Sequence, residues 1–330
     1  MALLGGTLLT ISDWAKRIDA NGKIARIAEL LSQRTPILED LPFIEANDIL
    51  GHRTTVRTGL PLAAWKKLNS GVPFTKSRTA QVTETIGIQE QRSAVDEDHP
   101  GVGLGLADLR LSEARPHIES IGQEFSSSFF YGSTSTAPEE IMGLSPRYNS
   151  LSAENAQNVI DAAGTGSDNT SVWLLNLAPD ETIFGIFPRG STSGIEHKDL
   201  GLQQIQDADD NWYSAYLDQW KMKSGVVVKD WRYGVRIANI DVSNLVAESS
   251  GADLAKRMIA ALNTIQGTSS GRTLFYMNRT VKNMLDIQRL NNLRTSGMTY
   301  RDVDGKMIPT FQDVEIRVTD SLVNNEARVV

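Results

Sequence analysis

Residues 52–90 have the sequence HRTTVRTGLPLAAWKKLNSGVPFTKSRTAQVTETIGIQE. The two flanks, 52–58 and 79–90, are rich in Thr, Val and Ile, which are enriched in β-strands. About twenty residues with two prolines separate the flanks. A structureless loop of that length is uncommon in a compact domain and is usually functional. The stretch therefore predicts a long β-hairpin arm with an extended tip.

Charge is segregated along this arm and the residues that follow it. Residues 52–83 carry no acid and six basic residues, namely Arg53, Arg57, Lys66, Lys67, Lys76 and Arg78. Residues 84–98 carry Arg92 and five acids, namely Glu84, Glu90, Asp96, Glu97 and Asp98. Surfaces of opposite sign can select each other as partners.

A two-stranded arm has no core of its own and is marginally stable in water. Docking on a neighbouring subunit would stabilise it, and repeated head-to-tail contacts close into rings or shells. The alternative, a hairpin that folds back on its own domain, stays open at this point. The expected inter-subunit contact residues are the six basic residues, the tip aromatics Trp65 and Phe74, and the acids Asp96, Glu97 and Asp98.

Two further segments show helical periodicity. Residues 12–34 place apolar side chains at roughly helical spacing, and Asn21-Gly22 interrupts them; the apolar residues are Trp14, Ile18, Ile24, Ile27, Leu30 and Leu31. Residues 104–131 predict a long amphipathic helix through Ile118, Ile121, Phe125 and Phe129. Pro116 is expected to kink this helix or to mark its first turn, and Gly132 is expected to end it.

The rest of the chain alternates short strands with helices. Residues 133–170 predict mostly loop, with a short helical candidate near 152–162. The predicted strands are 172–177, 183–187, 225–231, 234–241, 273–277 and 314–319, and the predicted helices are 252–266 and 279–290. No internal repeat and no doubly wound series of strands and helices is visible, so the fold class is α+β.

Composition excludes several classes of protein. The 330 residues include 40% hydrophobic and 22% charged residues, which is typical of a globular protein. No cysteine is present, so disulfides, thiol catalysis and iron–sulfur clusters are excluded. No segment has the roughly 20 apolar residues of a membrane span, and the first residues do not resemble a signal peptide. The net charge of −7 argues against a protein whose main task is to grip nucleic acid.

For each candidate chemical motif, a structural role explains the residues better than a catalytic or ligand-binding role. The G-x-G-x-G at 101–105 lacks dinucleotide-binding spacing and predicts a flexible joint before the long helix. Residues 190–194 have Thr where a nucleophile elbow needs Ser, and predict a flexible loop. Residues 196–199 predict a charged loop. Residues 207–218 resemble a calcium loop but have Trp212 at the glycine position, so an acidic exposed loop is expected. The histidines at 52, 99, 117 and 197 have no paired ligand spacing. We therefore expect no catalysis, metal or cofactor.

Several stretches occur in an order that is similar to one family. They are Phe129-Phe130-Tyr131-Gly132 followed by Pro138 and Gly143-Leu144, then Val172-Trp173-Leu174, Ile183–Pro188 with Gly190, Tyr276–Arg279, and Val314–Asp320. With the N-terminal arm, the basic hairpin and the long helix, this order resembles the major capsid protein of tailed double-stranded DNA bacteriophages, the Hong Kong 97-type fold. The stretch at 172–190 looks closest to the short-tailed phages.

The resemblance implies a division of the whole chain into parts. Residues 1–51 would be an N-terminal arm, 52–91 the extended hairpin loop over a neighbour, and 92–145 a peripheral domain with the spine helix, returning near 300–320. Residues 146–300 would be the axial domain around pentamer and hexamer centres. Residues 301–330 would be a C-terminal strand region.

The implied function is a structural shell protein that forms pentamers and hexamers around packaged double-stranded DNA in the virion, after assembly in the host cytoplasm. The implied partners are other copies, the portal and a separate scaffolding protein, with a cement protein as a further option; DNA would be contacted weakly, and no membrane is involved. Lys66 and Lys67 have no matching acceptor for covalent crosslinks. The alternatives are a nanocompartment shell of the same fold and a soluble oligomeric enzyme.

Overall fold

A computed structural model describes most of the chain in two compact units, which we treat separately. The described residues are 33–48, 51–98, 102–206, 210–246, 253–268, 270–291, 298–303 and 306–330. Unit 1 comprises 1–35, 88–126 and 194–223, and unit 2 comprises 36–87, 127–193 and 224–330. The helix expected at 12–34 lies outside the described residues, except for its last two, which are not helical.

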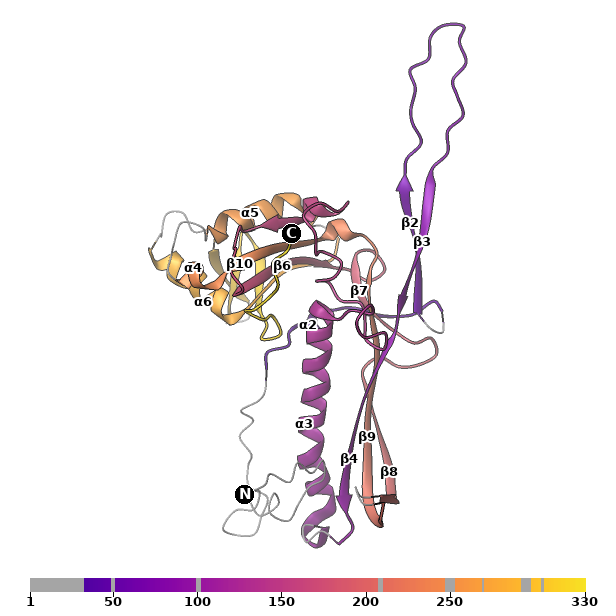
Figure 1. Ribbon diagram of the computed structural model, residues 1–330, viewed down its shortest axis with the longest axis vertical. Coiled ribbons are helices and arrows are strands. Elements are labelled where there is room, and N and C mark those ends of the chain that lie inside the picture. The colour runs from indigo at the N-terminus through magenta and orange to yellow at the C-terminus, as the bar shows by residue number, and fades with distance from the viewer. Residues whose placement is uncertain are drawn as a thin grey trace. The chain divides into compact units, whose positions relative to one another are not determined.

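The described part of unit 1 contains one helix and a ribbon of three strands. Helix α3 (Val102–Tyr131) lies alongside β4 (Gly87–Asp96), β8 (Ile195–Gln206) and β9 (Trp212–Val228) (Figure 1). β8 and β9 pair antiparallel, with His197 opposite Trp220. Ile121 and Phe125 of α3 and Trp220 of β9 are buried. Each fully buried side chain of this size contributes about 1.5–3 kcal/mol, which explains why polar strands stay attached to the helix.

The helix is longer than the sequence suggests at its N-terminal end. It begins at Val102, so Gly103 and Gly105 are helical and the expectation of a flexible joint at these positions is wrong. Pro116 lies inside the helix rather than in its first turn. Gly132 follows the last helical residue, as expected. Only glycine fits at this position, because a Cβ would lie 2.5 Å from the carbonyl oxygen of Ile141.

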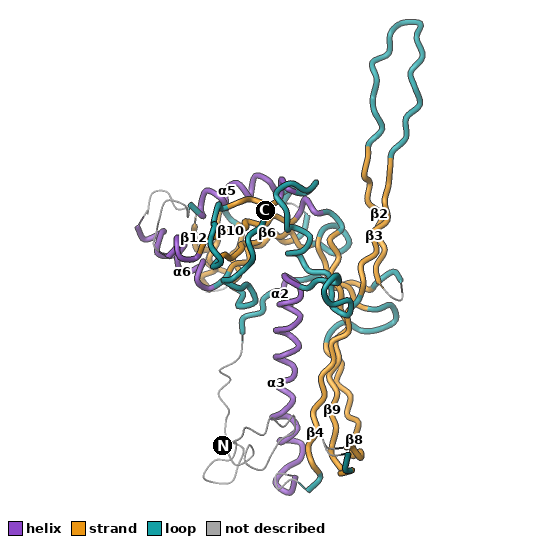
Figure 2. Tube along the Cα trace, in the orientation of Figure 1, coloured by secondary structure: helices purple, strands orange, loops and turns teal. Residues whose placement is uncertain are grey.

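Unit 2 is built on a mixed sheet (Figure 2). The central strand β6 (Asn169–Leu177) is buried at all nine positions and lies between β10 (Gly234–Asp241) and β11 (Arg272–Met277), both antiparallel to it. The other strands in this unit are β1 (Phe43–Glu45), β5 (Val159–Asp161), β7 (Ile183–Phe187), β12 (Met298–Val303), β13 (Lys306–Phe311) and β14 (Val314–Val318). The last residues of β9, 224–228, also lie in unit 2 and pair antiparallel with β7. This arrangement confirms the α+β class.

Amphipathic helices cover the sheet of unit 2. They include α5 (Leu254–Thr264) and α6 (Arg279–Asn291), with the short helices α2 (Ile37–Asp40) and α4 (Val242–Val246) and 3₁₀ turns at Ala156–Asn158 and Trp231–Tyr233. Met258 of α5 and Val281 of α6 join one buried cluster with Phe275 of β11. The predicted strands 183–187, 234–241, 273–277 and 314–319 and the predicted helices 252–266 and 279–290 are confirmed to within two residues at their ends, which is the usual uncertainty of such boundaries. β6 begins three residues before the predicted strand 172–177.

A buried polar network ties the C-terminal residues to this sheet. Arg236 donates to the Glu326 carboxylate at 2.7 Å, and Tyr131 donates to the same carboxylate at 2.5 Å. Both members of the ion pair are almost completely buried. Asn239 also exchanges two hydrogen bonds with the backbone of Val329. The last residues of the chain are therefore part of the core of unit 2.

Residues 36–46 contact the rest of unit 2 at two points. The buried carboxylate of Asp40 pairs with Arg272 at 2.6 Å and with Arg317 at 3.2 Å. Further along, the ring of Phe43 fills the space where a Cβ on Gly185 would stand, 2.5 Å away. These contacts fix where the chain enters the hairpin arm.

Three sequence expectations are wrong, at the start of β4, at the start of β9 and near β5. The flank expected at 79–90 is two strands, because the pairing with β2 stops at Thr85 and β4 begins at Gly87. The strand expected at 225–231 begins much earlier, at Trp212. The helical candidate near 152–162 is a 3₁₀ turn followed by β5.

The charged and acidic loops expected in unit 1 are also strands. Residues 196–199 belong to β8, and 212–218 of the expected loop 207–218 belong to β9, while 207–209 lie outside the described residues. Asp218 is buried rather than exposed, because Arg110 of α3 neutralises it. Polar residues hide these strands in the sequence, since the ribbon has a solvent-facing side along most of its length.

Candidate assembly surfaces

The hairpin arm is present in unit 2. β2 (Gly51–Gly59) pairs antiparallel with β3 (Arg78–Thr85), with Thr54 opposite Val82. Residues 60–77 form the extended tip, and all of them are exposed (Figure 1). Both predicted flanks and the predicted tip are confirmed, apart from the end of the second flank.

The tip presents large apolar side chains to solvent. Trp65 is 102% exposed and Phe74 is 107% exposed. Three leucines share this exposure, namely Leu60, Leu62 and Leu68. A turn closes the tip, with the Ser70 amide donating to the Lys67 carbonyl at 3.2 Å and Asn69 at a φ of +61°. Contiguous exposed apolar groups of this kind mark interaction sites.

The basic residues of the arm are exposed. The Arg53 guanidinium lies 3.4 Å from the Asp48 carboxylate of the same chain, and both side chains are about half exposed. The exposed basic residues beyond it are Arg57, Lys66, Lys67, Lys76 and Arg78. These charges lie beside the apolar tip, so the arm can offer apolar contact and positive charge to the same partner.

A buried ion pair holds the base of the arm. Arg147 donates to both oxygens of the Glu84 carboxylate, at 2.6 and 2.7 Å, and Glu84 is buried at the end of β3. Arg147 also donates to the carbonyl oxygens of Met142 and Gly143. A Cβ on Gly51 would lie 2.2 Å from the Glu84 carbonyl oxygen, so only glycine fits there. The arm is thus clamped at its base and exposed at its tip.

The five acids that follow the basic stretch have different environments. The Glu84 carboxylate binds Arg147 within unit 2, as described above. Glu90 in unit 1 accepts hydrogen bonds from Lys221, Gln219 and Arg92, which lower its pKa to about 2. The other three acids, Asp96, Glu97 and Asp98, are exposed at the end of β4. The exposed acids of this stretch that no ion pair within the chain occupies among the described contacts are therefore 96–98.

A second polar cluster in unit 1 joins α3 to the strands. Arg110 donates to both oxygens of the buried Asp218 carboxylate, at 2.8 and 2.6 Å, and pairs with Asp199 at 2.6 Å. The hydrogen bonds to Asp218 and Asp199 raise the pKa of Arg110, and the bond from Arg110 lowers the pKa of Asp199. His197 lies 2.8 Å from the Asp218 carboxylate through its Nε2. These ion pairs join the helix to the ribbon.

The Trp220 ring packs between polar partners in the same unit. The His117 ring stacks on it with centroids 4.8 Å apart, and the His197 ring does so at 5.4 Å. Burial lowers the pKa of His117. Beside this stack, α3 and the strands enclose a groove of about 400 Å³. Leu111, Ala114 and Ile118 of α3 line one wall of the groove.

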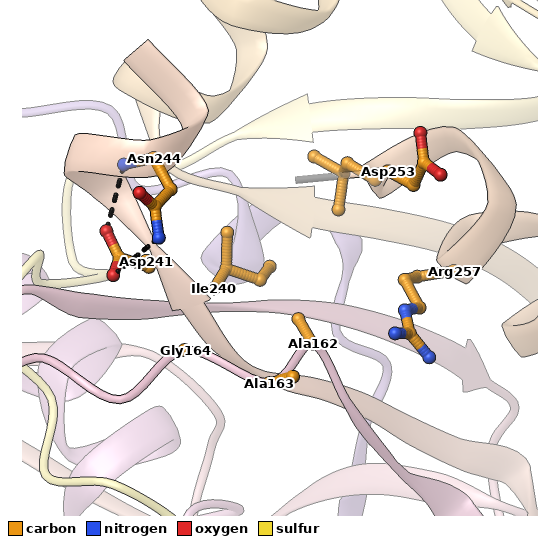
Figure 3. A pocket seen from close by; sticks show the side chains of 9 residues that line it. Ala162, Ala163, Gly164, Ile240, Asp241, Asn244, Asp253 and Arg257 are labelled. Carbon is orange, nitrogen blue, oxygen red and sulfur yellow. Dashed lines mark hydrogen bonds between the residues drawn. The ribbon is translucent and has the colours of Figure 1, made fainter. Parts of the chain in front are cut away.

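Unit 2 contains a small pocket beside β10 (Figure 3). Its volume of about 30 Å³ is close to that of one water molecule. Asn244 donates to Asp241 on one side, and Asp253 and Arg257 lie on the other side. Within the described ranges, no group of three potential metal-ligating side chains occurs. The pocket offers too little space for an organic substrate.

Neither unit carries a helix that could cross a membrane, as far as the described residues extend.

Sequence reasoning named the tip aromatics and missed two features of the arm. Leu60, Leu62 and Leu68 are also largely exposed, and their positions within the predicted tip could have identified them. Arg147 was missed because its partner Glu84 lies 63 residues away, and nothing in the sequence marks the pair.

Comparison with protein families explains this arrangement. The family model described as major capsid protein GP7 matches residues 19–330. The chain belongs to the major capsid protein GP7 family. A chain in the structure of bacteriophage Epsilon15 is 32% identical to this capsid protein, with a TM-score of 0.79, and the match covers 100% of this chain and 99% of that one.

Other solved structures match the capsid protein less closely. A chain of the bacteriophage JBD30 capsid is 10% identical with a TM-score of 0.49, covering 89% of this chain and 92% of that chain. A chain from the capsid of a native GTA particle is 8% identical with a TM-score of 0.44, covering 66% and 96%. A comparison with curated proteins finds no match.

These findings confirm the main expectations from the sequence. The capsid protein has the Hong Kong 97-type fold and is a structural component of an icosahedral phage shell. It is not an enzyme, so the hypothesis of a soluble enzyme is wrong. The family is that of a phage capsid rather than of a nanocompartment. Copies of the protein associate into capsomers and reside in the shell of the virion.

Proposed function

We propose that the capsid protein forms pentamers and hexamers that enclose double-stranded DNA, and that the hairpin arm of each subunit docks on a neighbour. The observation that supports docking is the tip at 60–77, where Trp65 and Phe74 are fully exposed on an arm without a core. Covering side chains of this size is worth about 1.5–3 kcal/mol each. The free energy that the isolated arm lacks is thus available on assembly.

Opposite charges determine how the arm aligns on the neighbouring subunit. The six basic residues of the arm face a partner surface that we assign to Asp96, Glu97 and Asp98 of a neighbouring subunit. Individual exposed ion pairs contribute only about 0–1 kcal/mol. The charges therefore select the partner and its orientation, while the apolar tip supplies most of the free energy.

Other partners follow from the same function. A separate scaffolding protein guides assembly in the host cytoplasm, the portal occupies one vertex, and a cement protein is a further option. The subunit has a net charge of −7, so it repels packaged DNA more than it attracts it. DNA contacts are consequently weak and independent of base sequence.

The decisive experiment compares two exposed tryptophans. Trp65 lies at the tip of the arm, and Trp212 is 65% exposed on β9 in unit 1. Trp65→Ala should reduce the yield of closed shells in electron microscopy far more than Trp212→Ala does, while both subunits melt at the same temperature. Equal shell yields for the two variants would refute docking of the arm through its tip.

A further inference from the structure

The hairpin arm joins the rest of unit 2 through a small buried contact. We define the arm base as residues 51–54 of β2 and 82–85 of β3, which pair with each other. His52 lies opposite Glu84 in this register, and both side chains are buried. Opposite residues of an antiparallel pair share one face of the sheet. The arm base therefore buries two ionisable side chains on the same face.

These two side chains differ in how their polar atoms are satisfied. The Glu84 carboxylate accepts two hydrogen bonds from Arg147, so its charge is paired. The His52 ring packs edge-on against Phe184, with centroids 5.6 Å apart, and Phe184 belongs to a buried apolar cluster. The Nδ1 atom of His52 is buried and has no hydrogen-bond partner among the described residues. A neutral imidazole fits these surroundings, whereas an imidazolium would be a buried charge without a partner.

The charged groups around His52 offer little compensation for a proton. Asp180 raises the pKa of His52 and Lys229 lowers it, and these two side chains form an ion pair with each other at 3.0 Å. The Glu84 carboxylate opposite His52 is bound to Arg147. Burial is the largest influence, and it lowers the pKa of His52 below the ordinary value of 6.5. Proton uptake is therefore easier when the ring is in solvent than when it lies against Phe184.

We propose that His52 makes the arm base a pH-sensitive hinge: on taking up a proton, the ring leaves its contact with Phe184 and frees the arm from the rest of unit 2. Acid favours the open state because that state binds more protons. The Asn47 side chain, which exchanges two hydrogen bonds with the Arg53 backbone, remains as a tether. The effect of acid on shells rests on the proposed docking of the arm, whereas the hinge itself does not.

Hydrogen exchange of the unassembled subunit, followed by mass spectrometry, tests the hinge. Peptides that cover the arm base are compared at pH 7.5 and pH 5.5, after correction for the intrinsic effect of pH on exchange. A histidine that is protonated only in the open state raises the open fraction by at most about tenfold over this range. We expect exchange at the arm base to rise between about twofold and tenfold. It should stay faster than exchange of β6 at both pH values, because the opening is local.

Two variants separate His52 from other titrating groups. His52→Gln should abolish the rise, and His52→Phe, which keeps an aromatic ring against Phe184, replaces it if the glutamine variant does not fold. His117→Gln, a matched change in unit 1, should retain the rise.

Three outcomes would overturn the hinge: no rise in the unmodified protein, an equal rise in the folded His52 variant, or equal exchange of the arm base and β6 at both pH values. The measurement needs no shell, so its failure is distinct from a failure of arm docking, which the Trp65→Ala comparison detects.

Discussion

The hairpin arm and the sheet core of unit 2 are stabilised in opposite ways. In the sheet core even the charged groups have partners inside the chain, as the buried Arg236–Glu326 pair shows. In the arm, the tip at 60–77 exposes its largest apolar side chains, and the chain offers nothing to cover them among the described residues. The apolar side chains of the sheet core are buried within the single subunit, whereas those of the tip are left exposed to solvent.

This difference separates the effects of substitutions. A change in the sheet core alters the free energy of unfolding of the isolated subunit. A change in the tip leaves that quantity almost untouched and alters assembly, where many subunits each repeat the same modest contact. The base of the arm, where Arg147 binds Glu84, belongs to both classes, because it is buried and also sets the direction of the arm.

The largest loss of stability is expected from Glu326→Ala. This change leaves the buried Arg236 guanidinium without its carboxylate and removes the acceptor of the Tyr131 hydroxyl. Breaking a buried ion pair on one side costs about 3–5 kcal/mol. Urea denaturation of the isolated subunit measures the loss. Lys256→Ala, which breaks an exposed pair with Asp253, is the control and should cost less than about 1 kcal/mol.

A smaller loss is expected from Arg147→Met at the base of the arm. The substitution keeps an apolar stem but leaves the buried Glu84 carboxylate unpaired, at a cost of about 1–3 kcal/mol. Because the same pair fixes the end of β3, shell yield should also fall. Arg279→Met, whose guanidinium is largely exposed, is the matched control. A stability loss without any change in assembly would show that the pair does not orient the arm.

Acid should destabilise the subunit through two histidines. Burial lowers the pKa of His52 in unit 2 and of His117 in unit 1 below the ordinary value of 6.5. The unfolded chain therefore binds more protons than the folded chain as the pH falls through 6.5, and stability is lost in that direction. The loss is at most about 1.4 kcal/mol per pH unit for each histidine.

The midpoints of urea denaturation from pH 7 to pH 5 measure this loss. The double variant His52→Gln with His117→Gln should make the free energy of unfolding depend less on pH. An unchanged slope in that double variant would assign the effect to other groups.

Much of the sheet core could be predicted because its strands are apolar runs between turns. β7 and β10 have the predicted limits, since Ile183–Phe187 and 234–241 stand between clear breaks in the sequence. The hairpin was equally visible, because its Thr-rich flanks enclose a tip with two prolines. β7 and β10 owe their structure to local sequence and to burial on both faces, whereas the exposed hairpin owes its structure to local sequence.

There is a physical reason why the ribbon of unit 1 could not be predicted from the sequence. β8 contains Glu196, His197, Lys198 and Asp199 in succession, a sequence that looks like a loop. It is a strand because β9 pairs with it and because Arg110, on a distant helix, forms ion pairs with Asp199 of β8 and Asp218 of β9. The same long-range pairing hid the buried state of Asp218. Contacts between distant residues carry the information that sequence periodicity lacks.

The smallest effect on the isolated subunit is expected from reversing the charge of Lys66 and Lys67. Both side chains are exposed, so the double variant Lys66→Glu with Lys67→Glu should change the free energy of unfolding by less than about 0.5 kcal/mol. Shell yield, measured by electron microscopy and light scattering, should nevertheless fall, because like charges would now meet at Asp96–Asp98 of the neighbour.

Asp96→Lys with Asp98→Lys in the same chain restores opposite charges and should recover shells. Recovery would identify 96–98 as the surface that receives the arm, whereas failure to recover, in subunits that melt normally, would move that surface elsewhere. If the lysine reversal instead lowered stability as much as assembly, the arm would be a folding element of its own subunit and the contrast with the sheet core would disappear.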